Sequence, residues 1–365
     1  MVNHLGNWKN GELGDFVTLK RGFDLPQQKR EDGQVPIFSS SGITGTHSTA
    51  MVKAPGVITG RYGTIGEVFY AAKDFWPLNT TLFVEDFHGN DAKFIYYFLK
   101  TLEWSKFTSA SAVPGINRNT VHKEIVSLPD VETQRRIAST LSMFDEKIKI
   151  NTEINDNLAD LLQTIYQDRF GNDILAVNQG VLSDICSYSR DKVAVSELNV
   201  STYFSTENML SEKAGSTEAT SLPTTSQTTA CHKGDTLISN IRPYFKKIVY
   251  CEGNCGCSTD VLCFTPSQPR YSTYLFSTLY ADKFFAFMVA GSKGTKMPRG
   301  DKQQIMTYPV VLPSEEELAG FNTIASPLLK QIYSNRAENK RLSILRDTLL
   351  PKLMSGEIDV SAVQL

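Results

Sequence analysis

The sequence predicts an α+β fold, in which two similar α/β domains are separated by two long helices that pair as an antiparallel coiled coil, in a pseudo-two-fold internal repeat. Three observations support this prediction. Apolar residues recur at spacings of three and four along residues 131–170, the same pattern returns 184 positions later, and similar short motifs precede both stretches. The expected parts are a first domain at 1–129, a long helix at 130–170, a second domain at 171–313, a second long helix at 314–357 and a tail at 358–365.

The two predicted helices carry matching seams with the 3.5-residue period of a coiled coil. The first seam is Ile137, Leu141, Phe144, Ile148, Asn151, Asn155, Leu158, Leu162 and Ile165, and the second is Phe321, Ala325, Leu328, Ile332, Asn335, Asn339, Leu342, Arg346 and Leu349. Two asparagines interrupt each seam at the same steps, and polar residues at such positions set the register of a coiled coil at a cost in stability. The expected polar layers are Asn151 with Asn339, and Asn155 with Asn335. The alternative is two unrelated surface helices with ordinary apolar stripes.

Sequence signals mark both ends of each helix. A Leu-Pro pair precedes each one and is followed by Asp130 in the first copy and by Ser314 in the second, which we expect to be N-caps. Ser314 and Glu317 form a capping-box sequence, and Gly171 and Gly356 stand where a helix would end in a left-handed residue. Because the first helix leads through a short link to the second domain, which in turn feeds the start of the second helix, the helices are expected to run antiparallel.

Composition limits the class of protein. The chain has 41% hydrophobic and 21% charged residues and a formal net charge of -2. No run of about eighteen apolar residues occurs, and residues 1–10 lack a signal-peptide pattern, so we expect a cytoplasmic protein that does not enter a membrane. A net charge near zero excludes a protein that coats nucleic acid by bulk charge, but it permits a local basic surface.

Cysteines and histidines give little sign of a metal site. All six cysteines lie in the second half, and the last four have the spacing C-x3-C-x-C-x5-C, unlike the separated C-x2-C pairs of common zinc sites. Cys263 lies in an alternating run typical of a strand, so reduced thiols in a strand pair are favoured over a structural metal. The five histidines are scattered and show no metal-like pairing. We therefore expect no metal ligands.

Each predicted domain contains a turn that carries an arginine and a tyrosine. In the first domain, Arg61 and Tyr62 follow a strand and lie within a G-x2-G-x2-G segment that begins at Gly60. This spacing differs from the dinucleotide-binding fingerprint, and the segment is also compatible with a plain hairpin. In the second domain, Arg242 and Tyr244 are expected to occupy the corresponding turn. Polar loops at 108–118 and 291–299 precede the two long helices, and a Ser/Thr-rich stretch at 211–229 is expected to be a mobile insertion.

The order and duplication of these motifs resemble the specificity subunit of type I restriction-modification enzymes. The resemblance covers nearly the whole chain and rests on Leu128-Pro129 and Leu312-Pro313, the segment 60–66, and the ending 349–358. It implies that each domain is a target-recognition domain for one half of a bipartite site in double-stranded DNA. It also implies that the helices bind two methyltransferase subunits, which are joined by motor-nuclease subunits. S-adenosylmethionine, ATP and magnesium would then belong to these partners, with no cofactor in this chain.

Missing motifs agree with a non-catalytic subunit. The sequence contains no G-x4-G-K-[ST] phosphate-binding loop and no Asn-Pro-Pro-Tyr or Asp-Pro-Pro-Tyr sequence like those of amino-methyltransferases, so the motor and the methyl transfer must come from partners. Two alternatives remain open: a coiled-coil scaffold that binds only protein, and a metal-dependent nuclease with an unfamiliar site.

The candidate DNA-contacting residues are the polar and basic residues of the turns and loops. Arginine suits guanine, asparagine suits adenine, and serine, lysine and backbone amides hold phosphates. The candidates are Ser40, Ser41, Arg61, Tyr62, Asn79, Arg118, Asn240, Arg242, Tyr244, Lys246, Lys247, Ser258, Lys296 and Arg299. Apolar residues outside the seams are candidates for docking the methyltransferase subunits, namely Leu161, Tyr166, Leu345 and Leu350.

Overall fold

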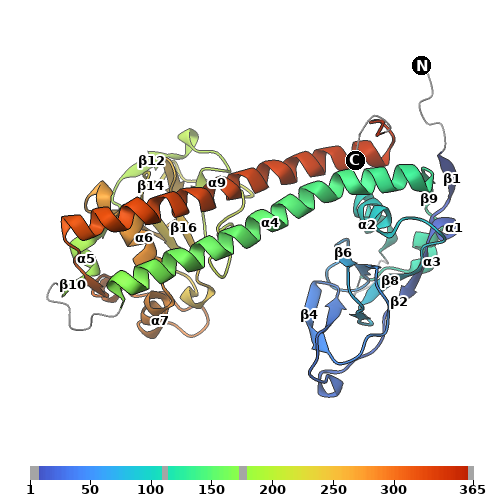
Figure 1. Cartoon of the computed structure of the whole chain (residues 1–365), viewed down its shortest axis with the longest axis horizontal. Helices are drawn as coiled ribbons and strands as arrows, with labels where there is room; N and C mark the ends of the chain where they lie inside the picture. The colour runs from blue at the N-terminus through green and yellow to red at the C-terminus, as the bar shows by residue number, and fades with distance from the viewer. Residues whose placement is uncertain (1–7, 109–113, 172–178, 361–365) are drawn as a thin grey trace. The chain divides into compact units, whose positions relative to one another are not determined.

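A computed structural model describes residues 8–108, 114–171 and 179–360. Its contacts divide the chain into two compact units: unit 1 contains Met1–Lys149 and Asn339–Leu365, and unit 2 contains Ile150–Glu338. Each unit holds one α/β domain and a segment of each long helix (Figure 1). Most of the predicted link at 171–179, part of the loop at 108–118 and the end of the predicted tail lie outside the described residues.

The first domain is built from three small sheets. In the described part of unit 1, a four-stranded sheet has the order β2-β8-β5-β6, a three-stranded sheet has the order β4-β3-β7, and β1 pairs with β9. The strands are β1 (Lys9–Glu12), β2 (Thr18–Arg21), β3 (Val35–Ser39), β4 (Gly42–His47), β5 (Gly56–Gly60), β6 (Val68–Ala71), β7 (Trp76–Pro77), β8 (Thr81–Asp86) and β9 (Ile125–Leu128). The helices are α1 (Leu13–Phe16), α2 (Ala92–Thr101) and α3 (Arg118–His122), with 3-10 turns at Gln27–Lys29 and Trp104–Phe107.

The second domain repeats this plan. In the described part of unit 2, the sheets have the orders β11-β18-β15-β16 and β12-β14-β17-β13, and β10 pairs with β19. The strands are β10 (Gln179–Val181), β11 (Cys186–Tyr188), β12 (Lys192–Ala194), β13 (Tyr203–Phe204), β14 (Gln227–Cys231), β15 (Thr236–Ser239), β16 (Ile248–Tyr250), β17 (Cys255–Cys257), β18 (Val261–Pro266) and β19 (Pro309–Val311). The helices are α5 (Leu182–Ile185), α6 (Ser272–Tyr280), α7 (Asp282–Ala290) and α8 (Lys302–Met306), with 3-10 turns at Val195–Glu197, Pro243–Phe245 and Pro269–Tyr271.

The two long helices are α4 (Val131–Phe170) and α9 (Glu315–Met354). In unit 2 they run antiparallel, since Asn335 donates its side-chain amide to Asn155 Oδ1 at 2.9 Å while Asn151, earlier in α4, donates to Glu338 Oε2 at 2.7 Å, later in α9 (Figure 1). Every seam position is at least half-buried. None of the helices within the described ranges combines the length and hydropathy of a membrane span.

Unit 1 contains the other half of the pairing, with the same polarity. Asn339 donates to the carbonyl of Ile148 at 3.3 Å, and Arg346 donates to Asp145 Oδ1 at 2.5 Å. The residue numbers again fall in α9 as they rise in α4. The antiparallel coiled coil predicted from the connectivity is therefore confirmed within each unit.

The helix ends agree with the sequence signals except at one glycine. Asp130 accepts a hydrogen bond from Thr133 N at 3.0 Å, and the Ser314–Glu317 capping box is present, with Ser314 N donating to Glu317 at 2.8 Å. Gly356 has a positive φ of 73° and ends α9 as predicted. Gly171 does not take a positive φ, and its amide donates to the Gln167 carbonyl at 2.8 Å instead.

Two residues expected on the outer helix faces are buried instead. Tyr166 is 7% exposed because its ring lies against Phe170, Tyr274 and Phe321 in the core of unit 2. Leu350 is 9% exposed and belongs to the core of unit 1. The prediction that these two side chains dock a partner is wrong, because each faces its own unit's α/β domain.

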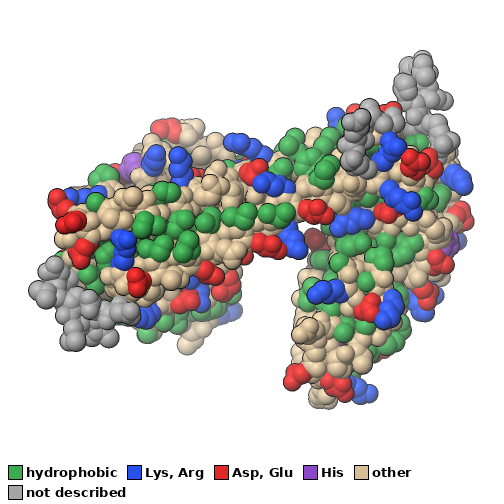
Figure 2. Space-filling model, viewed as in Figure 1, with side chains coloured by type: hydrophobic (Ala, Val, Ile, Leu, Met, Phe, Trp, Pro, Cys, Tyr) green, Lys and Arg blue, Asp and Glu red, His purple; other side chains and the backbone are tan. Residues whose placement is uncertain are grey.

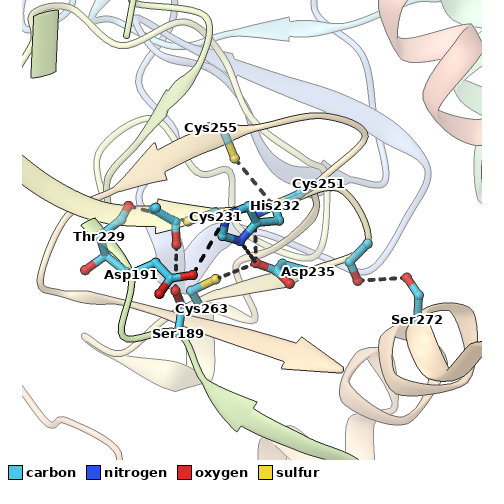
Figure 3. A network of polar contacts seen from close by, with 12 residues as sticks. Ser189, Asp191, Thr229, Cys231, His232, Asp235, Cys251, Cys255, Cys263 and Ser272 are labelled. Carbon is cyan, nitrogen blue, oxygen red and sulfur yellow. Dashed lines mark hydrogen bonds and ion pairs between the residues drawn. The ribbon is translucent and has the colours of Figure 1, made fainter. Parts of the chain in front are cut away.

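Five cysteines belong to one buried cluster of the second domain, and Figure 3 shows Cys231, Cys251, Cys255 and Cys263 of this cluster. Cys231 and Cys255 face each other across β14 and β17, Cys255 Sγ donates to Cys251 Sγ at 3.5 Å, and Cys263 donates to Asp235 Oδ2 at 3.2 Å. All six cysteines of the chain are buried free thiols. Among the described residues, no group of three or more His, Cys, Asp or Glu side chains could hold a metal ion.

The polar layer of unit 2 gives a first stability prediction. Asn155→Ala is expected to lower the free energy of unfolding by about 1–3 kcal/mol, because the buried amide of Asn335 loses its acceptor. The double variant Asn155→Leu/Asn335→Leu should recover most of this loss, because both polar groups are removed together. Chemical denaturation followed by circular dichroism measures both, with Asn157→Ala on the exposed face as the control. Equal losses in the single and double variants would contradict the account.

Candidate nucleic-acid interface

In the first domain, β5 ends at a junction of three chain segments. Arg61 N donates to the Thr80 carbonyl at 2.8 Å, and Ile116 N donates to the Arg61 carbonyl at 3.0 Å. Tyr62 forms an isolated bridge with Gly115. Backbone bonds on both sides therefore hold Arg61 and Tyr62 in place, although they lie outside regular strands.

The side chains of this junction are also ordered by packing. The Arg61 guanidinium lies over the Tyr62 ring, 4.5 Å from its centroid. The same ring covers Gly115, where an added Cβ would come within 2.1 Å of Tyr62 Cε1, so only glycine fits there. Within the described part of the chain, Arg61 makes no salt bridge. The Tyr62 ring therefore orients the guanidinium without occupying its N–H donors.

The other first-domain candidates lie at different distances from this junction. Ser40 is adjacent, since its Oγ would be 3.1 Å from a Cβ at Gly63. Ser41 contacts Ser39, with 3.1 Å between their hydroxyl oxygens, and the Asn79 amide donates to Asp24. Arg118 is exposed at the start of α3. The structure thus brings Ser40, Arg61 and Tyr62 together, while the Asn79 side chain is engaged by an acidic residue.

The second domain forms the same junction with different side chains. Asn240 N donates to the Asp260 carbonyl at 2.8 Å, and Gly300 N donates to the Asn240 carbonyl at 3.3 Å. Ile241 forms the isolated bridge, here with Arg299. The same bonds recur in the same order, which makes Asn240 the structural counterpart of Arg61.

This register corrects the correspondence drawn from sequence. The structural counterparts are Arg61 with Asn240, Tyr62 with Ile241, Thr80 with Asp260, Gly115 with Arg299, and Asn117 with Asp301, the last two being the N-caps of α3 and α8. Arg242 therefore lies two positions past the counterpart of Arg61. Similarly, Ser258 corresponds to Leu78, because each accepts a bond through its carbonyl from the first residue of the following strand.

An open cleft of about 620 Å³ lies beside the second junction. Its walls come from 203–207, 221–223, 241–247, 258–260 and Met297. Arg242 lines it with a left-handed backbone (φ 50°), and Lys247 Nζ donates to the Thr206 carbonyl at 2.6 Å. Burial lowers the pKa of Lys247.

The Ser/Thr-rich stretch 211–229 contributes to this cleft and is not a loose insertion. Ala219 N donates to the Val200 carbonyl at 2.8 Å, and Thr217 N donates to the Asn208 carbonyl at 2.8 Å. Ser221 lines the cleft. The prediction of a mobile insertion is wrong, because backbone bonds anchor this segment to the domain.

The remaining second-domain candidates differ in accessibility. Asn240 is only 7% exposed, so its side chain is withdrawn from the surface, contrary to expectation. Lys246 is paired with Asp282 at 3.0 Å, Tyr244 is exposed, and Lys296 is exposed on the loop that ends at Arg299. Ser258 lines the cleft.

Sequence reasoning missed two kinds of residue at these junctions. Asp260 is acidic, so a pattern of basic and amide side chains does not indicate it. Its carboxylate nevertheless pairs with the Arg299 guanidinium at 3.1 Å. Thr206, whose hydroxyl oxygen lies 3.1 Å from Ser239 Oγ, is the counterpart of Ser40. The repeat itself was the signal that could have found Thr206, because Ser40 was already a candidate.

Comparisons with known proteins indicate the family to which this chain is similar. Residues 6–159 match the type I restriction modification DNA specificity domain. The chain is 22% identical over 336 residues to the specificity subunit of the type I restriction enzyme MjaIX of Methanocaldococcus jannaschii, covering 74% of this chain and 70% of that protein. It is 29% identical over 99 residues to the HindI specificity subunit of Haemophilus influenzae, covering 26% of this chain and 22% of that protein.

A solved structure supports the fold. The type I restriction-modification S subunit from M. genitalium has a TM-score of 0.63 with this chain at 19% identity, covering 97% of each chain. At this identity the likeness shows the fold, and it agrees with the two-domain, two-helix plan described above.

Proposed function

This chain belongs to the family of type I restriction-modification specificity subunits, and we propose that its two domains each recognise one half of a bipartite site in double-stranded DNA. The observation that carries the proposal is the repeated junction, which presents a guanidinium beside polar residues in both domains. The chain is a non-catalytic subunit of such a complex. The protein-only scaffold has no comparable support.

The chemistry of the junctions suits contacts to both bases and phosphates. The half-buried Arg61 and the exposed Arg299 carry N–H donors that match the acceptors of guanine, whereas Ser40, Ser258 and Lys296 carry hydroxyl or ammonium donors suited to phosphate oxygens. The cleft beside Arg242 provides a concave surface with one half-buried lysine, Lys247, and several hydroxyls. Asp260 in the same cleft balances part of the positive charge, so binding would depend on fit as well as charge.

The helix pair would dock the methyltransferase subunits. Hydrophobic side chains gather along α4 and α9 in unit 2 (Figure 2), where Leu161 is 47% exposed; in unit 1, Leu345 is 51% exposed. These two residues lie at equivalent steps of the repeat, 184 positions apart. One docking surface in each repeat fits two methyltransferase subunits, with S-adenosylmethionine, ATP and magnesium bound by the methyltransferase and motor-nuclease partners.

Introducing a negative charge at the docking residues tests this stoichiometry. Leu161→Glu should remove one methyltransferase subunit from the co-purified complex, Leu345→Glu the other, and the double variant both, because each carboxylate would be buried without a partner. Native mass spectrometry counts the subunits, with Ser334→Glu at another exposed helix position as the control. A complex that keeps two methyltransferase subunits in the double variant would contradict this docking surface.

Co-expression with the methyltransferase tests the function itself. The purified complex should bind one bipartite sequence more tightly than scrambled DNA of equal length at fixed salt, and by a factor of about 10³ or more. Complexes that bind both DNAs alike, with intact folding and subunit composition, would rule out the proposal.

A further inference from the structure

Each domain orients the guanidinium of one arginine at the equivalent junction, and the two domains do so by different interactions. We propose that Tyr62 and Asp260 are positioning residues, which fix Arg61 and Arg299 so that each arginine recognises a guanine in its own half-site. This inference rests on the proposed function and deepens it, since it names the base and the supporting side chain in each domain.

The argument begins with the shared backbone. In both junctions, a backbone hydrogen bond joins the residue after the central strand to the residue before the next strand. Arg61 N donates to the Thr80 carbonyl, and Asn240 N donates to the Asp260 carbonyl, each at 2.8 Å. A scaffold conserved between the repeats gives both domains the same surface to present to DNA. The side chains on that scaffold are where two different half-sites can be distinguished.

In the first domain the guanidinium is held by an aromatic ring. Arg61 lies 4.5 Å from the centroid of Tyr62, and that ring is itself fixed over the backbone of Gly115. Stacking on a ring face leaves the N–H groups in the plane of the guanidinium available. Among the described residues, none accepts a hydrogen bond from this guanidinium, so its fork remains available for guanine O6 and N7.

In the second domain the arginine comes from the opposite segment. Arg299 is the counterpart of Gly115, and its NH2 lies 3.1 Å from Asp260 Oδ1, where Asp260 is the counterpart of Thr80. The first domain has no acidic residue at this place and the second has no aromatic residue at the place of Tyr62, which is Ile241. In each domain, one arginine of the junction thus has one supporting side chain. The two domains take these residues from different segments of the junction.

The charge at Asp260 is the strongest sign that the pair serves recognition. A carboxylate on a surface that faces phosphates repels DNA, so Asp260, which lines the cleft together with Glu207, needs a compensating role, and its contact with Arg299 supplies one. The pair is half-exposed, with side-chain exposures of 55% for Arg299 and 42% for Asp260, so it adds little to folding stability. What it does provide is a guanidinium restricted by its contact with the carboxylate, and a restricted side chain loses less freedom on binding.

Binding by the complex with the methyltransferase tests the inference. Competition is measured at fixed salt against the preferred site and against sites with each base pair replaced in turn. Arg299→Ala should reduce discrimination at one guanine of the second half-site about tenfold or more, and Asp260→Asn should reduce it at the same position by a smaller factor. Arg61→Ala and Tyr62→Leu should act in the same way on one guanine of the first half-site.

A double variant distinguishes a positioning role of Asp260 from a merely structural one, because the effects of two residues that act together are not additive. The double variant Asp260→Asn/Arg299→Ala should discriminate no worse than Arg299→Ala, because the carboxylate acts through the guanidinium. The control is Asp191→Asn, an exposed carboxylate of the same domain that does not line the cleft. Thermal unfolding of each variant excludes loss of the domain.

The outcomes are distinct from those of the proposed function. A complex with no sequence preference before any substitution would overturn the proposed function. A wild-type complex that is specific, but whose preferences at every position survive Tyr62→Leu and Asp260→Asn, would overturn this inference alone. A uniform loss of affinity with a smaller salt dependence in Arg61→Ala and Arg299→Ala would also overturn it, because it would make both arginines phosphate contacts.

Discussion

Phe321→Ala should lower the free energy of unfolding of unit 2 by about 3–5 kcal/mol. Phe321 is fully buried, and its ring lies 6.4, 5.4 and 6.3 Å from the centroids of Tyr166, Phe170 and Tyr274. These four rings join α4, α6 and α9, so removing one leaves a cavity between helices that cannot close easily. Chemical denaturation of the full chain should show the loss in the transition assigned to unit 2.

A neighbouring exposed residue supplies the control for this prediction. Ile324 is on the same helix and 42% exposed, so Ile324→Ala should change stability by less than about 1 kcal/mol. Similar losses for both variants would show that the aromatic cluster is not what ties the helices to the second domain.

Asp145→Ala should cost about 3 kcal/mol in unit 1, the lower end of the range for breaking a buried ion pair. Asp145 accepts hydrogen bonds from Tyr97 Oη and from Arg346, both at 2.5 Å. Its side chain is 26% exposed and that of Arg346 is 20%, so solvent relieves part of the penalty. Burial, together with the bond to Asp145, raises the pKa of Tyr97, which therefore remains a donor at neutral pH.

A paired substitution identifies the source of this cost. The variant Asp145→Leu/Arg346→Leu should be more stable than Asp145→Ala, because it also removes the Arg346 guanidinium, which in Asp145→Ala keeps only the exposed Asp347 as its partner. Unfolding curves for the variants and the parent chain give the comparison. If the double variant were the less stable one, packing and not the guanidinium that has lost Asp145 would explain the loss.

The sequence was sufficient for the parts of the fold that depend on local patterns. The seam from Ile137 to Ile165, the caps at Asp130 and Ser314, and the antiparallel polarity all follow from periodicity, cap chemistry and connectivity. These signals act within one helix or one link. They do not depend on how distant segments meet.

The predictions that were wrong concern residues whose burial depends on contacts between distant segments. The helix period gave the seam but not the width of the buried face, so Tyr166 and Leu350 were placed outside when each packs on its own domain. Asn240 has a side chain suited to adenine, yet tertiary packing buries it. Residue type alone cannot distinguish a polar side chain on a surface from one withdrawn beneath it.

The candidate site was predicted in composition but not in register. Arg242 was matched to Arg61 because both precede a tyrosine in a turn, whereas the hydrogen bonds match Arg61 to Asn240. The turns differ in length between the repeats, so motif spacing could not give the correspondence. A prediction based on basic and amide side chains does not include Asp260, because this residue is acidic and its pairing with Arg299 depends on the fold.

The central claim is that each domain recognises its own half of one DNA site. The most direct test maps methylated bases across the genome of cells that express the methyltransferase with this chain, without it, and with residues 179–311 replaced by those of a relative with another target. The account predicts one bipartite methylated sequence that requires this chain and changes in only one half after the exchange. Methylation that is independent of the chain, or an exchange that alters both halves together, would contradict it.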